Sequence, residues 1–105
     1  MIAPTPTPPY YAVIFTSVRT VVDNNYAGIS QRMVELAEQQ PGYLGHESAR
    51  NELGITVSYW SSLEAIQNWK MNTEHLNAQQ NGREEWYAQY KTRVCKVERD
   101  YGFEK

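Results

Sequence analysis

Four stretches of the chain have the residue pattern of β-strands. Residues 10–18 (YYAVIFTSV) are rich in β-branched and aromatic side chains, as strands are. Residues 43–50 alternate weakly and residues 55–60 (ITVSYW) strongly, and the short turn between them indicates a hairpin. A fourth strand is predicted over residues 90–101. The middle of the first strand is apolar on both faces, so we expect both faces of the sheet to be covered.

The spacing of apolar residues predicts a first helix between the first two strands. Asp23 or Asn24 can cap its start, and it runs to about Gln39 before Pro41 and Gly42 end it. Its inner face is a stripe at three- and four-residue spacing, made of Tyr26, Ile29, Met33, Leu36 and Ala37.

A second helix is predicted to start at the S-x-x-E capping box from Ser61 to Glu64. The pair Asn72-Thr73 can interrupt it, and the helical pattern resumes toward Gln80. Its inner stripe is expected to contain Ile66, Trp69, Thr73 and Leu76. After a break at residues 81–82, one more helical turn precedes the last strand.

The order of these elements predicts an α+β domain with the ferredoxin-like βαββαβ fold. Right-handed crossovers place both helices on one face of a four-stranded antiparallel sheet. The other face needs a cover, and a second copy of the chain supplies one, so we expect a homodimer. Residues 1–9 contain four prolines and are predicted to form a flexible arm, whereas residues 10–105 form the single domain.

Composition and charge narrow the range of partners. The net charge of −2 and the lack of a basic stripe disfavour nucleic acid and anionic membranes. No apolar run approaches the roughly 18 residues of a membrane span, and the start of the chain does not have the pattern of a signal peptide. The single cysteine, Cys95, excludes an intrachain disulfide and fits a reducing compartment, so a cytoplasmic location is expected.

Several common catalytic motifs are missing from the sequence. His46, His75 and Cys95 are the candidate soft metal ligands, and no pair of them has the spacing of a metal site. There is no glycine-rich phosphate loop and no G-x-S-x-G motif. The sequence therefore predicts no metal ligands and no cofactor.

Residues 59–102 read YWSSLEAIQNWKMNTEHLNAQQNGREEWYAQYKTRVCKVERDYG. This run resembles the C-terminal half of the antibiotic biosynthesis monooxygenase (ABM) family, which belongs to the dimeric α+β barrel superfamily. The N-terminal half agrees in layout, with Pro41-Gly42-Tyr43 before the second strand, so the resemblance covers residues 10–101. Members of the family include cofactor-free oxygenases of polyketide phenols and quinols, and also haem-degrading enzymes.

The resemblance implies a pocket between the second helix and the sheet, lined by a helix tryptophan that matches Trp69. A cofactor-free oxygenase must bind a flat aromatic, remove its proton and stabilise the anion, because an ionised phenol can reduce oxygen directly. The candidate catalytic residues are His75 as general base, Trp69 as pocket wall and Arg93 as oxyanion partner. The candidate substrate-binding residues are Tyr59, Trp60, Asn72, Gln79, Arg83 and Tyr90.

Each of these candidates also has a purely structural interpretation. Trp69 is equally suited to the core, and His75 beside Glu74 to the solvated side of a helix. Arg93 suits a surface or interface ion pair, Arg83 suits a surface charge at the start of a helix, and Tyr90 suits a dimer contact.

The haem-degrading branch of the family makes a specific demand that this sequence does not meet. In that branch a histidine ligates the iron ten residues after the helix tryptophan, and an asparagine lies on the first strand. Here the matching position is Gln79, a poor iron ligand, and residues 10–18 contain no asparagine.

Three functions therefore follow from the sequence, in order of preference. The first is a cofactor-independent monooxygenase whose partners are molecular oxygen and a small phenol- or quinol-type aromatic. The second is a non-catalytic or stress-related dimer that binds a flat small molecule. The third is a haem-binding or haem-degrading protein.

Overall fold

The elements follow the predicted order along the chain. The computed structural model describes the backbone of residues 1–80 and 83–105 and the side chains of residues 1–74 and 85–105. The elements are β1 (Tyr10–Arg19), α1 (Tyr26–Glu38), β2 (Tyr43–Arg50), β3 (Gly54–Trp60), α2 (Leu63–Gln80), α3 (Arg83–Trp86) and β4 (Tyr87–Val97).

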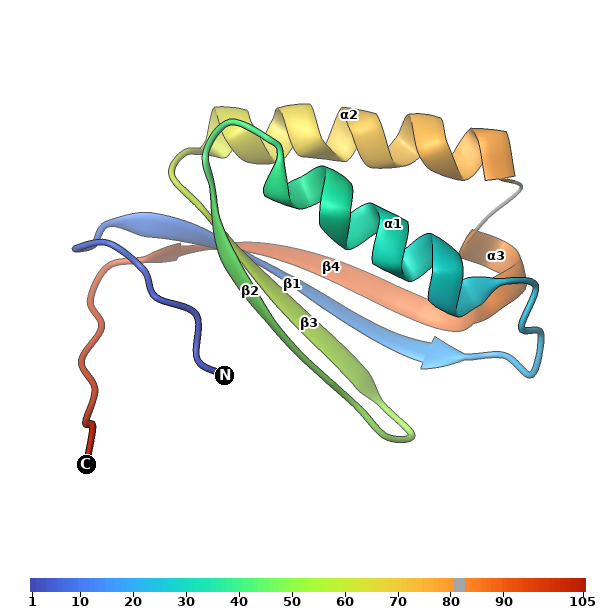
Figure 1. Ribbon diagram of the computed structural model, residues 1–105, viewed down its shortest axis with the longest axis horizontal. Helices are drawn as coiled ribbons and strands as arrows, with labels where there is room; N and C mark the ends of the chain where they lie inside the picture. The colour runs from blue at the N-terminus through green and yellow to red at the C-terminus, as the bar shows by residue number, and fades with distance from the viewer. Residues whose placement is uncertain (81–82) are drawn as a thin grey trace.

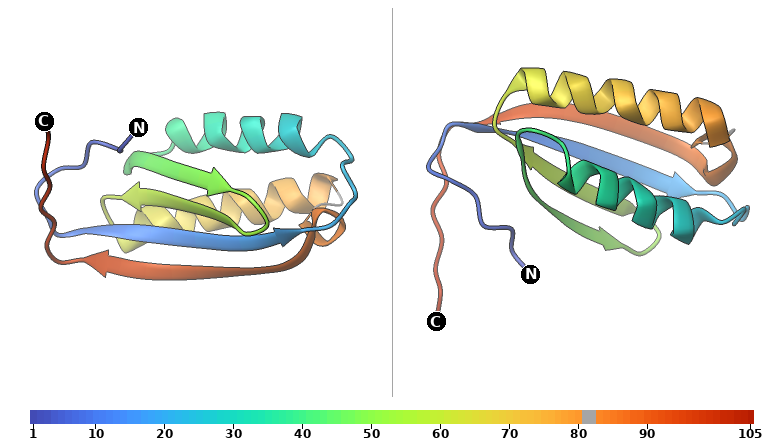
Figure 2. Two further views of the ribbon diagram at one scale, coloured as in Figure 1. Left: turned by 90° about the horizontal axis from the view of Figure 1, so that it is seen from below. Right: turned by 45° about the horizontal axis from the view of Figure 1, so that its top comes forward.

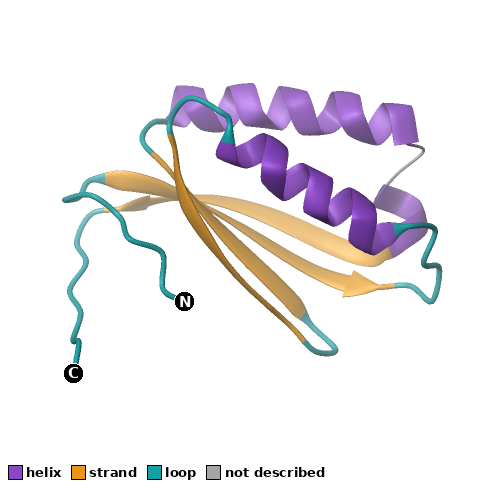
Figure 3. Ribbon diagram, in the orientation of Figure 1, coloured by secondary structure: helices purple, strands orange, loops and turns teal. Residues whose placement is uncertain are grey.

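The strands form one antiparallel sheet in the order β2-β3-β1-β4. Both long helices lie on the same side of this sheet, and the two chain ends lie on the other (Figures 1 and 3). The oblique view shows α1 over the β2 side of the sheet and α2 beside it (Figure 2). This arrangement is the ferredoxin-like α+β fold, as predicted. Among the described residues, no helix is long and apolar enough to cross a membrane.

Strand pairing assigns the side chains of the sheet to its two faces. Tyr11 and Val13 on β1 pack against the core cluster beneath α2, so odd-numbered β1 residues face the helices. Their direct partners share that face: Tyr11 pairs with Trp60, and Phe15 pairs with Thr92 of β4. We call this the helix-side face, and the opposite one the open face.

The fully buried core is small and lies at one end of the helix-side face. It consists of Trp60, which has no exposed surface, with Ala65 and Ile66 from the first turn of α2. Tyr43 and Trp69 pack around it but stay partly exposed. The inner stripe predicted for α2 is confirmed where it is described, because Ile66 and Thr73 are both buried.

The two helices start differently from the prediction. The N-cap of α1 is Asn25, in the left-handed conformation and without a side-chain cap hydrogen bond, so neither Asp23 nor Asn24 holds that position. For α2 the cap is Ser62, whose Oγ accepts a hydrogen bond from the Ala65 amide at 3.0 Å. The cap thus lies one residue after Ser61, the predicted cap.

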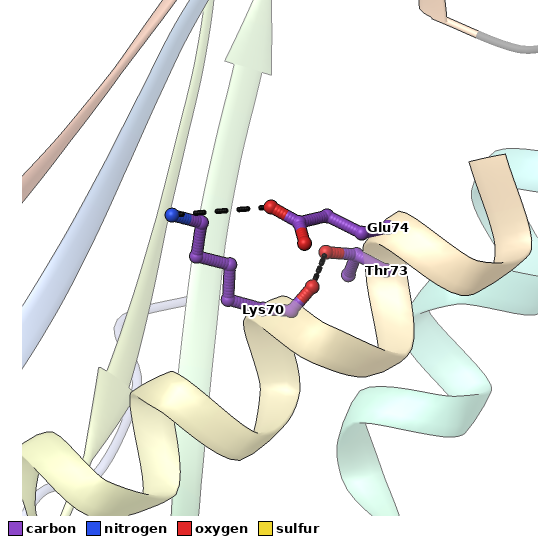
Figure 4. A network of polar contacts seen from close by, with 3 residues as sticks. All are labelled: Lys70, Thr73 and Glu74. Atoms are coloured by element: carbon purple, nitrogen blue, oxygen red, sulfur yellow. Dashed lines mark hydrogen bonds and ion pairs between the residues drawn. The ribbon is translucent and has the colours of Figure 1, made fainter. Parts of the chain in front are cut away.

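The predicted interruption of the second helix is wrong, because α2 is continuous from Leu63 to Gln80. Thr73 keeps its polar group satisfied inside the helix by donating to the Lys70 carbonyl at 2.8 Å. Lys70 and Glu74 form an exposed ion pair one turn apart, at 3.9 Å, on the solvent side (Figure 4). These contacts within the helix allow α2 to continue through Thr73.

The last strand begins three residues earlier and ends four residues earlier than predicted, at Tyr87 and Val97. Pairing with β1 explains both limits, because Arg19 at the end of β1 meets Tyr87 and Tyr10 at its start meets Val97. Past Val97 there is no β1 residue left to pair with.

The N-terminal arm makes contacts that its proline content does not predict. The Ala3 amide donates to Glu47 Oε2 at 2.9 Å, and Thr5 Oγ1 donates to the Tyr10 hydroxyl at 3.0 Å. Glu47 Oε1 also accepts from the Tyr59 hydroxyl, at 2.6 Å. The arm is thereby attached to the open face next to β2.

These contacts predict an acid-sensitive attachment of the arm. The hydrogen bonds from Tyr59 and Ala3 lower the pKa of Glu47, while burial and Glu47 raise the pKa of Tyr59 to about 12. The pKa of Glu47 in the folded chain lies below its unfolded value of about 4.3. The ionised Glu47 therefore stabilises the fold above the unfolded pKa, and this stabilisation is lost as the pH falls through the folded pKa.

Urea unfolding between about pH 3 and pH 6 tests this. We expect Glu47→Gln to be less stable than the wild type at the upper limit, with a difference that shrinks as the pH falls. Glu35→Gln, at an exposed α1 position, should follow the wild type throughout. A constant difference between Glu47→Gln and wild type over the whole range would contradict the assignment.

Candidate active site

The helix-side face of β2 and β3 is polar, although the helices cover it. His46 pairs with Ser58, and Ser48 pairs with Thr56, all on this face. Thr56 and Ser58 lie on a central strand yet remain only half-buried. Half-exposed side chains at the centre of a covered face indicate that solvent enters between helices and sheet, as a ligand site requires.

Two tryptophans form a flat wall at the core end of this face. The rings of Trp60 and Trp69 are stacked, with centroids 6.1 Å apart and planes at 25°. Trp60 Nε1 donates to Ser58 Oγ at 2.9 Å, which fixes the buried indole. Trp69 is half-buried, so one part of the wall is open to a bound molecule. Stacked indoles suit a flat aromatic ligand.

His46 lies next to this wall. Its Nδ1 makes a short hydrogen bond with the Tyr43 hydroxyl, and the Tyr43 ring in turn packs edge-on against Trp60, with centroids 5.6 Å apart. Burial and the negative charge of Glu38 raise the pKa of Tyr43, so its hydroxyl stays protonated. The contact holds the imidazole in place through Nδ1 and leaves Nε2 for another group.

A second aromatic group lies at the other end of the helix-side face, where α1 begins. The Tyr26 ring meets Trp86 and Tyr87 edge-on, at 5.7 and 5.8 Å between centroids. The Tyr87 hydroxyl donates to the Tyr26 oxygen at 3.1 Å, and the Arg19 guanidinium lies 3.5 Å from the centre of the Tyr26 ring.

The phenol of Tyr26 is set to ionise more easily than an ordinary tyrosine. Burial by itself would raise its pKa, but hydrogen bonds from Tyr87 and Ser30 and the positive charges of Arg50 and Arg19 act in the other direction, and the net pKa is lowered.

The Arg50 side chain reaches this region by passing directly over the backbone of Gly54. Its Nη2 donates to the hydroxyl of Ser17, which is almost completely buried. A Cβ on Gly54 would lie 2.0 Å from the same nitrogen, so any side chain there would displace the guanidinium. The absence of a side chain at position 54 is therefore what allows Arg50 to lie on the helix side.

The structure brings together some of the predicted site residues and separates others. Trp60 and Trp69 lie together on the helix side, and the Tyr90 ring reaches the same side at 5.5 Å from Phe15. Tyr59 bonds Glu47 and Arg93 pairs with Ile14, which places both on the open face. Within one chain these two residues do not share a pocket with Trp69, because alternate residues of a strand face opposite ways.

Of the remaining predicted residues, Asn72 is the one whose side chain is described. Asn72 is exposed and donates to Gln40 Oε1 at 3.3 Å and to the Asn68 carbonyl at 3.0 Å. The side chains of His75, Gln79 and Arg83 lie outside the described residues.

Sequence reasoning considered His46 only as a metal ligand and Tyr26 only as part of the apolar stripe of the first helix, and it did not single out Arg50. For the two β2 residues the reason is a bulge between Tyr43 and Gly45, which shifts the alternation and puts Tyr43 and His46 on one face. His46, Ser48 and Arg50 share one side of the strand, but nothing local showed that this polar side faces the helices.

Among the described residues, no group of three or more His, Cys, Asp or Glu side chains is arranged to hold a metal ion. A shallow hollow of about 150 Å³ does exist at the β1–β4 end of the open face, where Leu53, Lys91 and Arg93 border it. It lies on the opposite face from the tryptophan wall.

Comparison with known proteins identifies the family. The sequence model of the family described as "Antibiotic biosynthesis monooxygenase" matches residues 9–81. The chain belongs to this family. It is also 52% identical over 102 residues to the uncharacterized protein YqjZ of Bacillus subtilis, with 95% of this chain and 90% of that protein covered.

Solved structures of other proteins share the fold at low sequence identity. SnoaB, a cofactor-independent oxygenase from Streptomyces nogalater, superposes with a TM-score of 0.71 at 10% identity, covering 89% of this chain and 97% of SnoaB. A variant of MhuD with two manganese protoporphyrin IX molecules bound per active site has a TM-score of 0.66 at 20% identity, covering 89% and 99%. The fold of this chain is thus shared with a cofactor-independent oxygenase and with a protein that holds manganese protoporphyrin IX.

Proposed function

We propose that this chain is a cofactor-independent monooxygenase of a small phenol- or quinol-type aromatic. The observation that carries the proposal is the Trp60–Trp69 wall with His46 beside it, on a face that solvent reaches. Membership of the ABM family supports a monooxygenase-like chemistry. The fold shared with SnoaB, itself a cofactor-independent oxygenase, is consistent with it.

In the proposed reaction the protein supplies binding and one proton transfer. The substrate ring packs on Trp69, and His46 accepts the phenolic proton at Nε2 while its Nδ1–H is held by the Tyr43 oxygen. The resulting phenolate supplies the electrons that reduce oxygen. For a substrate methylene, one oxygen atom becomes the new carbonyl and the other leaves as water, so no external reductant is needed.

Two histidines compete for the role of proton acceptor. His46 has the described position next to the wall, and His75 is the one that the sequence pattern favours. Substituting each separately distinguishes them, because general-base catalysis is worth roughly 10²- to 10⁴-fold in rate.

A homodimer is part of the proposal. The open face carries apolar side chains of Ala12, Ile14, Ile55 and Val57 on its two central strands, and Ile55 is 42% exposed. A second copy on this face would remove them from water, which supports the two-subunit arrangement implied by the family resemblance.

Oxygen uptake with hydroxyanthrones and quinols tests the function. We expect saturable uptake by the metal-stripped wild type, loss of uptake in Trp69→Ala, and a fall of about 10²-fold or more in kcat for the histidine variant that removes the base. Lys70→Gln changes the solvent side of the same helix and is expected to match the wild type.

Two other results would replace the proposal. Binding of the aromatic without uptake above the uncatalysed rate would indicate a non-catalytic binding dimer. A Soret shift on haem titration, with no uptake from phenols, would indicate haem chemistry instead.

A further inference from the structure

The region around Tyr26 has a different chemical character from the tryptophan wall. It lies where Arg50 and Gly54 meet β1, six residues along β3 from Trp60. At about 3.3 Å per strand residue this is roughly 20 Å away, beyond the reach of a small aromatic bound at Trp69. Any ligand here would occupy a separate site, independent of the proposed oxygenase activity.

Two positive charges converge on Tyr26 without a negative partner. The Arg19 guanidinium covers its ring, and the charge of Arg50 acts on the same phenol. Within the described side chains neither arginine forms an ion pair, the only such pair being Lys70–Glu74. Glu85, on the segment that packs against β1, is bound by Asn24 at 2.6 Å instead. Neither guanidinium therefore has a carboxylate within ion-pair distance among the described side chains, and an anionic ligand would supply one.

The guanidiniums are held in position before any ligand arrives. Arg19 donates through Nε to the Trp86 carbonyl and through Nη2 to the Val22 carbonyl, each at 3.0 Å. Arg50 is held through Nη2 by the buried Ser17, and its remaining N–H donors are free to meet an acceptor from solvent, because the residue is exposed. Such preorganisation favours recognition of a carboxylate.

Aromatic rings lie directly beside these charges. Phe15 meets Tyr87 at 5.4 Å between centroids, and both are only half-buried. The Trp86 side chain is buried, with 5% of its surface exposed. Its Nε1 has no hydrogen-bond acceptor among the described residues. A buried indole N–H without a partner is uncommon, and a ligand oxygen is one way to satisfy it.

We propose that Arg19, Arg50 and the Tyr26 hydroxyl form a binding site for the carboxylate of an aromatic acid, whose ring packs on Phe15 and Tyr87. The carboxylate supplies the negative charge that the described residues lack. Arg50 is the specificity-determining residue, because it is the guanidinium that solvent reaches.

Calorimetric titration with 2-naphthoate and its uncharged analogue 2-naphthalenemethanol tests this. We expect 2-naphthoate to bind at least about tenfold more tightly, as charge-assisted hydrogen bonds allow. Arg50→Gln should abolish that preference, and Arg50→Lys should retain part of it because the charge remains. Arg32→Gln, at an exposed α1 position, should leave the preference intact.

A spectroscopic measurement keeps the test independent of folding defects. With ring-labelled tyrosine, the ¹³Cζ resonance of Tyr26 reports its ionisation, and bound 2-naphthoate should raise the Tyr26 pKa in the wild type but not in Arg50→Gln.

Three results would overturn the proposal: no binding of 2-naphthoate, equal affinity for both probes, or a preference that survives Arg50→Gln. Trp69→Ala separates this site from the proposed oxygenase. If it abolishes 2-naphthoate binding, the acid binds at the tryptophan wall and the Tyr26 site is rejected. If it abolishes only oxygen uptake, both sites stand.

Discussion

Replacing Trp60 with alanine is expected to lower the free energy of unfolding by about 3–5 kcal/mol. Trp60 is the largest side chain without exposed surface, and Ala65, Ile66 and Trp69 pack around it. Its removal leaves a cavity that Ala65 and Ile66 cannot fill, and it takes away the donor to Ser58. Urea unfolding followed by far-UV circular dichroism measures the loss. Since small domains are stable by only about 5–15 kcal/mol, the variant should be close to unfolding.

Trp69→Ala is the matched comparison. Trp69 belongs to the same stacked pair but is half-exposed, so its removal transfers less surface to water. We expect a clearly smaller loss of stability, which allows this variant to be used in activity assays. A loss for Trp60→Ala equal to or below that of Trp69→Ala would show that the core is not centred on Trp60.

Gly42→Ala is expected to lower the free energy of unfolding by about 3 kcal/mol. Gly42 has a φ of 87°, in the left-handed region that residues with a Cβ avoid. A Cβ there would also lie 2.6 Å from the Ala65 Cβ and 2.8 Å from Ser61 Oγ. Because the Gly42 carbonyl accepts from the Ser61 amide at 2.8 Å, the turn cannot move away without losing that bond.

Gly28→Ala provides a control in which the same substitution is not expected to lower the stability. Gly28 lies within α1, has no positive φ, and its new Cβ would meet only the mobile end of the Asn25 side chain, at 2.6 Å. Alanine has the better helix propensity, so stability should stay equal or rise by up to about 1 kcal/mol. Thermal or urea unfolding of both variants checks the pair. Similar losses at positions 42 and 28 would exclude the strained turn as the cause.

The secondary structure was largely predictable because it depends on short-range patterns. The alternation in residues 55–60, the apolar stripe of α1 and the Pro41-Gly42 stop all act over a few residues. Apart from the interruption of the second helix, which does not occur, the element predictions that failed concern end points, such as the Ser62 cap and the start of β4 at Tyr87. These depend on which hydrogen-bond partner is available, and for β4 that partner is β1, about 70 residues away in the chain.

The candidate site was predictable only in part. The tryptophans were identified because Trp69 lies on the inner stripe of a helix and Trp60 ends a strong strand. Tyr59 and Arg93 were grouped with them, yet strand alternation places both on the open face. The assignment of a strand's two sides to helix or open face depends on how the sheet is covered, which a local pattern does not contain.

Local chemistry in the chain thus dictated the fold class, the order of elements and the aromatic character of the inner face. Tertiary structure alone decided which polar residues meet there. His46 joins the tryptophan wall because a bulge in β2 turns it to the helix side. Arg50 and Arg19 converge on Tyr26 because Gly54 leaves room and because β1 ends close to the start of α1. Side chains from four separate elements gather only when long-range pairing sets their register, so no sequence window could have revealed their contact.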